Sequence, residues 1–324
     1  MEMQKLLPIV ALLAVLLVIA ALSNQGPSHR RLSEEVDLEQ LSPEDFLVSE
    51  VDRVEVVMAE EEKPSLALKR LSQEDWKVES LYGVPANTVK VESFIEKLKE
   101  LEGEFRARKK EVLPDFELNE EKAKKLLCYK KDESKAYFTL LLGKAAGSKE
   151  TFVRLPESNA VYSVAVSFDS ELSDKRGGSE GAPDGKVFME KRFFNLNGQK
   201  LAKLRLKYPD KEMVLERREK PKPSIDKSSM TTKEIEEIEK RPPEYQWHLA
   251  EGPKDLEFKE DAVDGIISGF TTLEAIDAVD PTTASRWGME DPPFEAEFVY
   301  QEGGGEYFTL LANRTAGKAF VRVA

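Results

Sequence analysis

The spacing most typical of catalysis occurs in Gly177-Gly178-Ser179-Glu180-Gly181, which matches the Gly-x-Ser-x-Gly pattern of a nucleophile elbow. In that motif the serine lies on a sharp turn between a buried strand and a helix, and a histidine accepts its proton. Here the polar residues 173–176 precede the segment and Ala182-Pro183-Asp184-Gly185 follow it, so neither flanking element is expected. The segment therefore predicts a flexible loop and no nucleophile.

The chain holds little other material for nucleophilic or thiol chemistry, because it has two histidines and one cysteine. His29 lies in a polar N-terminal segment, and His248 follows Trp247 in a predicted strand, where an outward polar position is the simple interpretation. Cys128 follows Leu126-Leu127 in a predicted strand, which favours a buried thiol. A single cysteine excludes an intramolecular disulfide and a cysteine-based zinc site.

Metal and phosphate binding are not predicted either. A calcium ion could contact loop carboxylates, but the EF-hand spacing is absent from Asp169, Glu171, Asp174, Glu180 and Asp184. The glycines of Leu142-Gly143-Lys144-Ala145-Ala146-Gly147 lack the Gly-Lys-Ser/Thr of a phosphate loop and predict a turn with positive φ. Asn313-Arg314-Thr315 has the form of a glycosylation acceptor in a predicted turn. We thus predict no catalytic, cofactor-binding or metal-binding residues.

The net charge of the chain limits the kinds of molecule that it can be expected to bind. Lys and Arg total 48 against 61 Asp and Glu, which gives a net charge of −13. Phosphate backbones need a basic footprint, so a general nucleic-acid binder is excluded. With 40% hydrophobic residues in 324, the chain can form about two domains with proper cores.

The N-terminal segment sets the expected compartment. Residues 6–22 are apolar and uncharged, and as a helix they would span roughly 25 Å, slightly less than a hydrocarbon core. Two interpretations stay open: an uncleaved transmembrane anchor, which we favour because the run is long for a signal peptide, and a cleaved signal ending at Ala21-Leu22-Ser23. We expect a single-pass protein of a cytoplasmic membrane with its C-terminal region outside the cytoplasm. A polar stalk is expected over residues 24–50.

The remaining sequence repeats itself. Tyr137-Phe138-Thr139-Leu140-Leu141 returns as Tyr307-Phe308-Thr309-Leu310-Leu311, Phe152-Val153-Arg154 as Phe320-Val321-Arg322, and Trp76 as Trp247. One apolar stripe at helical spacing also occurs twice, as Val91, Phe94, Ile95, Leu98 and Leu101 and as Val263, Ile266, Ile267, Phe270 and Leu273. We infer two units, 51–168 and 192–324.

Each unit predicts short strands around one helix, without alternation of parallel strands and helices. This pattern indicates an α+β fold with mainly antiparallel sheet. An acidic, Gly-rich linker is expected over 169–191, and a charged insertion over 219–244. Within the insertion, Thr231 and Glu234 form a capping box that predicts a short exposed helix.

The ordered pattern resembles the bacterial family catalogued as domain of unknown function 4340. The resemblance rests on Val51 to Val57, Trp76, the helix with Leu98 and Leu101, Phe116-Glu117-Leu118, Leu140 to Lys144 and Phe152 to Leu155. The chain departs from the family at Glu117, where glycine is usual, although Gly288 has that place in the second unit. The Leu-Leu-Leu-Gly segment also becomes Leu311-Ala312-Asn313 there.

The resemblance implies an accessory role outside the cytoplasmic membrane, because such proteins are commonly encoded beside gliding-motility-type ABC transporter components. It implies no activity and no site residues. The leading hypothesis is a non-enzymatic, membrane-anchored periplasmic scaffold or accessory protein with a protein partner in the cell envelope. The alternative is an envelope glycan- or peptide-binding module, or a hydrolase, using the groove between the two units.

Overall fold

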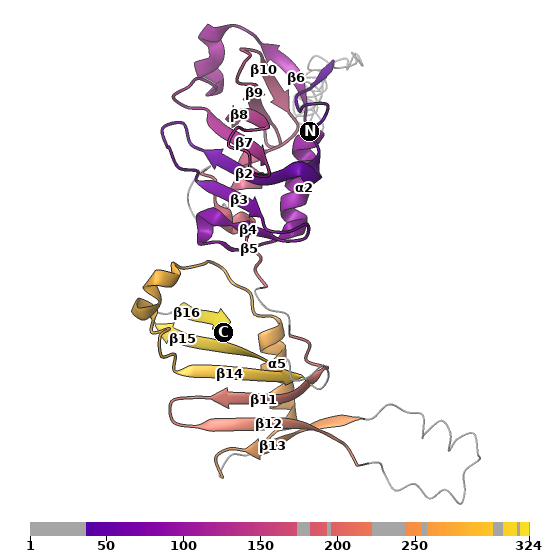
Figure 1. The fold of residues 1–324 in the computed structure, drawn as a ribbon, viewed down its shortest axis with the longest axis vertical. Coiled ribbons are helices and arrows are strands. Elements are labelled where there is room, and N and C mark those ends of the chain that lie inside the picture. Colours follow the sequence, from indigo (N-terminus) through magenta and orange to yellow (C-terminus); the bar gives the residue numbers. More distant parts are fainter. Residues whose placement is uncertain are drawn as a thin grey trace, which may run out of the picture.

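Two antiparallel sheets, of ten and six strands, form the framework of the protein in a computed structural model (Figure 1). The structure describes residues 37–173, 182–192, 196–221, 244–254, 258–300, 307–315 and 318–323. The predicted α+β class with mainly antiparallel sheet is therefore confirmed. The predicted anchor at residues 6–22 and the predicted helix at Thr231–Lys240 lie outside the described residues. Among the helices that are described, none has the length and apolar character needed to cross a membrane.

The ten-stranded sheet has the order β1-β6-β10-β9-β8-β7-β2-β3-β4-β5. Its strands are Leu38–Gln40 (β1), Val51–Val57 (β2), Leu66–Arg70 (β3), Trp76–Val78 (β4), Val84–Ala86 (β5), Glu102–Ala107 (β6), Lys124–Lys130 (β7), Phe138–Ala145 (β8), Thr151–Arg154 (β9) and Val161–Val164 (β10). Short helices connect them: Val48–Glu50 (η1), Glu79–Leu81 (η2), Lys110–Phe116 (η3), Phe168–Leu172 (α3) and Gly185–Val187 (η5).

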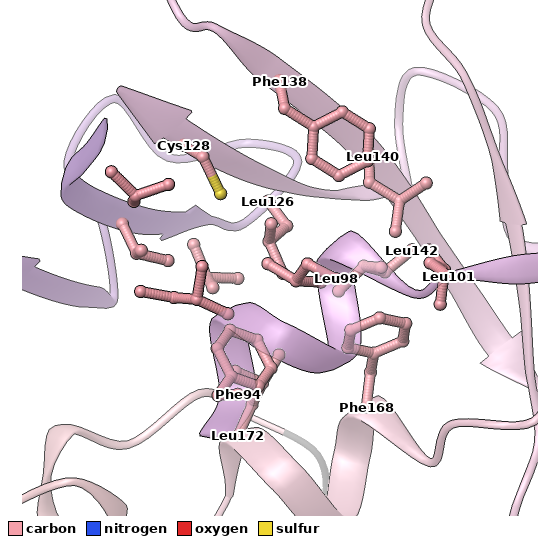
Figure 2. Packing of buried hydrophobic residues seen from close by; sticks show 14 of the residues in the cluster. Phe94, Leu98, Leu101, Leu126, Cys128, Phe138, Leu140, Leu142, Phe168 and Leu172 are labelled. Carbon is pink, nitrogen blue, oxygen red and sulfur yellow. The ribbon is translucent and has the colours of Figure 1, made fainter. Parts of the chain in front are cut away.

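Helix α2 (Thr88–Lys99) packs on this sheet through the predicted apolar stripe. The Asn87 side chain caps its first turn, because Oδ1 accepts from the Lys90 backbone N–H at 3.0 Å. All five residues of the stripe are buried, and Figure 2 shows Phe94, Leu98 and Leu101 beside Leu126, Cys128, Phe138, Leu140 and Leu142 from β7 and β8. Burying this stripe supplies most of the helix's stability, since isolated helices of this length are marginal in water.

Two segments expected to be exposed are parts of this first unit. In the predicted stalk, β1 pairs with β6 and Phe46 is buried against Tyr137, with ring centroids 5.4 Å apart. In the predicted linker, Leu172 and Phe188 join the core, and Met189 bridges to Ala86. In both segments a few apolar side chains, separated by many charged residues, pack against residues that are distant in sequence. The local composition alone therefore predicted exposed segments.

The six-stranded sheet has the order β13-β12-β11-β14-β15-β16. Its strands are Leu201–Lys207 (β11), Glu212–Glu219 (β12), Tyr245–Glu251 (β13), Phe294–Tyr300 (β14), Tyr307–Thr315 (β15) and Lys318–Val323 (β16). Helix α5 (Glu260–Thr271) lies on it, and the 3-10 helix Pro281–Trp287 (η7) follows. Of the second stripe, Val263 and Ile267 are buried, whereas Ile266 is exposed.

Six strands occur in the same order in both sheets. The order β9-β8-β7-β2-β3-β4 in the first sheet parallels β16-β15-β14-β11-β12-β13 in the second. Register agrees too, because Arg70 lies opposite Trp76 as Arg217 lies opposite Trp247. The first sheet continues past β4 and β9 with β5 and β10, whereas no described strand pairs with the outer edge of β13 or β16.

Two turn predictions were wrong. Gly143 lies inside β8 and has no positive φ, and Asn313 lies inside β15. Gly143 is required for close approach: a Cβ there would lie 2.2 Å from the Phe116 carbonyl oxygen and 2.8 Å from Leu118 Cγ. The residue that follows the 3-10 helix η3 or η7 adopts the left-handed conformation instead. It is Glu117 (φ 57°) in the first unit and Gly288 (φ 65°) in the second.

Candidate functional site

Of the residues that the sequence analysis considered for nucleophilic or thiol chemistry, the structure describes His248 and Cys128. Gly177–Gly181 and His29 lie outside the described residues. His248 lies on β13, half-buried, with its Nε2 2.9 Å from Nε2 of Gln246. Among the described residues, no serine, threonine or cysteine side chain contacts this imidazole through a hydrogen bond.

The carboxylates considered for calcium have other partners. Asp169 pairs with Lys124 at 2.8 Å, Glu171 with Lys97 at 2.6 Å, and Asp184 Oδ1 accepts from the Lys186 backbone N–H at 2.9 Å. Asp174 and Glu180 lie outside the described residues. The described part of the chain has no group of three or more His, Cys, Asp or Glu side chains placed to hold a metal ion.

Cys128 is fully buried on β7, opposite Val54 and Phe138, as the sequence predicted. Burial raises the pKa of its thiol well above the ordinary value of about 8.5, because the thiolate would lose its hydration. The thiol is therefore a core side chain, and it is not poised as a nucleophile.

We expect Cys128 to resist alkylation in the folded protein. Iodoacetamide needs the thiolate and access to it, so labelling at neutral pH should be at least about a hundredfold slower in buffer than in denaturing urea. Mass spectrometry of the intact chain measures both rates. Equal rates would show that this part of the core opens freely.

The amide of Asn313 is also occupied. Its Nδ2 donates to the carbonyl oxygen of Trp287 at 2.7 Å, which joins β15 to the end of η7. A Cβ at Gly288 would lie 2.4 Å from the same Nδ2 atom, so the glycine is required by the asparagine. This amide holds the fold and is unsuited to carrying a glycan.

A cluster of arginine, tryptophan and carboxylate occurs at the corresponding place in both units. In the first, the Arg70 guanidinium lies 4.6 Å from the centroid of a Trp76 ring and donates from Nε to the Val51 carbonyl at 3.0 Å. Its Nη atoms donate to the carbonyls of Val48 and Gln73, both at 3.2 Å, and reach Glu92 Oε1 of α2 at 3.4 Å. Backbone carbonyls and one carboxylate thus satisfy this guanidinium.

In the second unit the matching residues are Arg217 on β12, Trp247 on β13 and Asp264 on α5. Arg217 donates from Nη1 to the Gln199 carbonyl, and its guanidinium lies 5.0 Å from the Tyr245 ring centroid. Here the cluster lines a pocket of about 290 Å³, bounded by Arg217, Trp247, Asp264, Ile267, Gly198, Gln199, Ser268 and Thr271.

Sequence reasoning matched the two tryptophans but missed the arginines. The turn between β3 and β4 is short, whereas a long insertion separates β12 from β13, so no constant offset in sequence relates Arg70 to Arg217. Only strand register places each arginine opposite its tryptophan. This open pocket is the candidate binding site of the protein.

The groups that line the pocket are of the kinds found in ligand-recognition sites. They offer a guanidinium as donor, a carboxylate as acceptor and an indole as an apolar wall, a combination typical of ligand recognition. Acyl or phosphoryl transfer would need a nucleophile beside a base. The described lining residues include no histidine, cysteine or lysine, and the hydroxyl of Thr271 donates to the Ser268 carbonyl at 2.8 Å.

The family model described as Domain of unknown function (DUF4340) matches residues 76–292, well over half of the 324-residue chain. The match begins at the first residue of β4 and ends just before β14. No curated protein and no solved structure matches the chain.

Proposed function

The chain belongs to the DUF4340 family, and from that premise we propose that it is a non-enzymatic scaffold or accessory protein of the bacterial cell envelope. Residues 6–22 would anchor it in the cytoplasmic membrane as a single span, with both units on the periplasmic side. Its partner would be another envelope protein, and we propose a component of an ABC-type transporter.

The observation that carries this proposal is the difference between the edges of the two sheets. In the first unit β5 pairs with the outer side of β4, and β10 pairs with the outer side of β9. The outermost strands of that sheet, β1 and β5, are only three residues long, and β5 contains Pro85. The corresponding β13 and β16 have no described neighbour on their outer sides. Unpaired backbone groups along an edge strand are a template for strand addition by another chain. The net charge of −13 argues against nucleic acid as that partner.

We also propose that the two units descend from one duplicated unit. The shared order of six strands, the repeated Arg–Trp register and the recurring helix support this. On this view the extra strands of the first unit cover edges that stay unpaired in the second unit, and those unpaired edges of the second unit bind the partner.

Site-specific photo-crosslinking in the native membrane tests the scaffold role. A benzophenone side chain at Val323, exposed on β16, should capture a transporter subunit, whereas the same group at Val89, exposed on α2 of the first unit, should not. Mass spectrometry identifies the captured protein and shows whether peptides before Asn24 remain. Recovery of the protein alone from both positions would contradict the proposal, and so would sustained hydrolysis of envelope substrates by the purified full-length chain.

A further inference from the structure

The two arginine clusters differ in how much of each guanidinium is already used. Arg70 donates to three backbone carbonyls and reaches the Glu92 carboxylate. Within the described residues, Arg217 makes a single hydrogen bond, to the Gln199 carbonyl. A guanidinium has five N–H donors, so Arg217 retains donors for an acceptor that the described chain does not provide.

Two sequence differences explain why the second cluster is open. Asp264 replaces Glu92 and is one methylene shorter, and it forms no hydrogen bond or ion pair with any described residue. Gly198 lies three residues before β11, where Val48 lies three residues before β2 and packs against the first core. Side chains of the first unit fill the space beside its arginine, whereas the corresponding space in the second unit is a pocket of about 290 Å³.

The chemistry around this pocket matches a peptide group. The guanidinium of Arg217 presents donors, and the exposed carboxylate of Asp264 presents acceptors. A peptide group carries one carbonyl and one N–H, which complements both. A simple anion would be repelled by Asp264, and a simple cation by Arg217. Trp247 and Ile267, both largely buried, supply an apolar wall for one side chain.

The first unit indicates which kind of acceptor binds an arginine at this place in the fold. Three of the four acceptors of Arg70 are peptide carbonyls, which belong to Val48 in η1, to Val51 at the start of β2 and to Gln73 between β3 and β4. The pocket volume of about 290 Å³ is just below the range of roughly 300–1,000 Å³ for ligand sites, so it suits about one residue of an extended segment.

We propose that the pocket between α5, β12 and β13 is a peptide-binding site, in which Arg217 donates to a backbone carbonyl and Asp264 accepts from a backbone N–H of one extended residue. The bound residue places an apolar side chain against Trp247. The pocket lies at β12 and β13, whereas the scaffold role is tested at β16 on the opposite edge of the sheet, so the two proposals can fail independently.

NMR titration of the full-length protein with N-acetyl-L-leucine N-methylamide tests this inference. The probe has two peptide groups, one apolar side chain and no charge. We expect a saturable shift of one tryptophan indole N–H signal, the one that disappears in Trp247→Phe. Arg217→Met and Asp264→Asn should each weaken binding about tenfold, which is the effect of removing a hydrogen bond to a charged group.

Arg218→Met is the matched control, because it removes the neighbouring charge from the opposite face of β12 and should leave binding unchanged. Asp264 is exposed, so Asp264→Asn reports on the site even if Arg217→Met fails to fold. Three outcomes overturn the proposal: no saturable shift, equal shifts with acetate, which would make the pocket an anion site, or tighter binding of N-acetylglucosamine, which would make it a sugar site.

Discussion

Replacing Gly143 with alanine should destabilise the first unit by about 3 kcal/mol, at the upper end of the cost of overpacking a core. The added Cβ would meet the Phe116 carbonyl oxygen at 2.2 Å and Leu118 Cγ at 2.8 Å, and the first of these atoms is backbone. Backbone cannot rotate away as a flexible side chain can. The end of η3 would have to move off β8, and with it the ring of Phe116, which packs on Phe152 at 4.8 Å. Urea denaturation followed by far-UV circular dichroism measures the change.

Gly147→Ala is the matched control, because a Cβ there would meet nothing within 4 Å. It should leave stability unchanged or raise it by about 0.5 kcal/mol through a less flexible unfolded chain. If both variants lose the same stability, close packing at Gly143 is not the reason for the glycine.

In the second unit the contact between the strand and the end of the 3-10 helix has its glycine on the opposite side. There Asn313 stands at the place of Gly143 and Gly288 at the place of Glu117, and Asn313 donates to the Trp287 carbonyl at 2.7 Å. The two departures from the family pattern, Glu117 and Asn313, are thus explained by one contact. Each unit has one glycine at this contact, on the strand in the first unit and after the 3-10 helix in the second.

This exchange has a consequence that a double-mutant cycle can measure. Gly143→Asn should be severely destabilising alone, and Glu117→Gly should recover at least about 2 kcal/mol of that loss when combined with it, about 1 kcal/mol more than its effect alone, since contacting residues couple by 0.5–3 kcal/mol. Glu117→Gly alone should stabilise by about 1 kcal/mol, because Glu117 has φ 57° and an L-residue is disfavoured there. Strictly additive effects would contradict the proposed exchange.

Arg154→Met should cost the first unit about 3 kcal/mol. Arg154 is 7% exposed, and burial lowers the pKa of its guanidinium, although the group stays charged at neutral pH. Its Nε donates to the Leu118 carbonyl at 2.9 Å, and its Nη1 donates to the carbonyls of Ser158 at 3.1 Å and Pro156 at 3.3 Å. Methionine keeps most of the aliphatic volume but leaves these carbonyls without a donor, and each buried unsatisfied group costs about 1–3 kcal/mol.

Arg322→Met provides the comparison within the same chain. Arg322 follows Phe320-Val321 as Arg154 follows Phe152-Val153, and it lies opposite Leu311 as Arg154 lies opposite Leu141. Arg322 is exposed, so its replacement should change stability by less than about 0.5 kcal/mol. Thermal melting of both variants gives the two costs, and a similar loss from each would show that the carbonyl contacts of Arg154 contribute little.

Local pattern was sufficient wherever neighbours in sequence decide the structure. The spacing of Val91, Phe94, Ile95, Leu98 and Leu101 predicted a helix with one buried face, and α2 buries that face. The run of Leu126, Leu127 and Cys128 predicted a strand, which is β7. These predictions hold because the periods of helices and strands are properties of the backbone itself.

The sequence by itself thus determined the α+β class, the recurrence of its motifs, the buried thiol of Cys128 and the family. Only the tertiary structure decided the roles of residues that look alike in sequence: Arg154 is buried and Arg322 exposed, and Arg70 is satisfied and Arg217 open. It also placed Gly143 inside a strand and Glu117 in the left-handed region. The physical reason is that hydrogen-bond acceptors and packing partners for these side chains come from segments far apart in the chain. Their positions follow from strand register and turn length, which a sequence pattern does not contain.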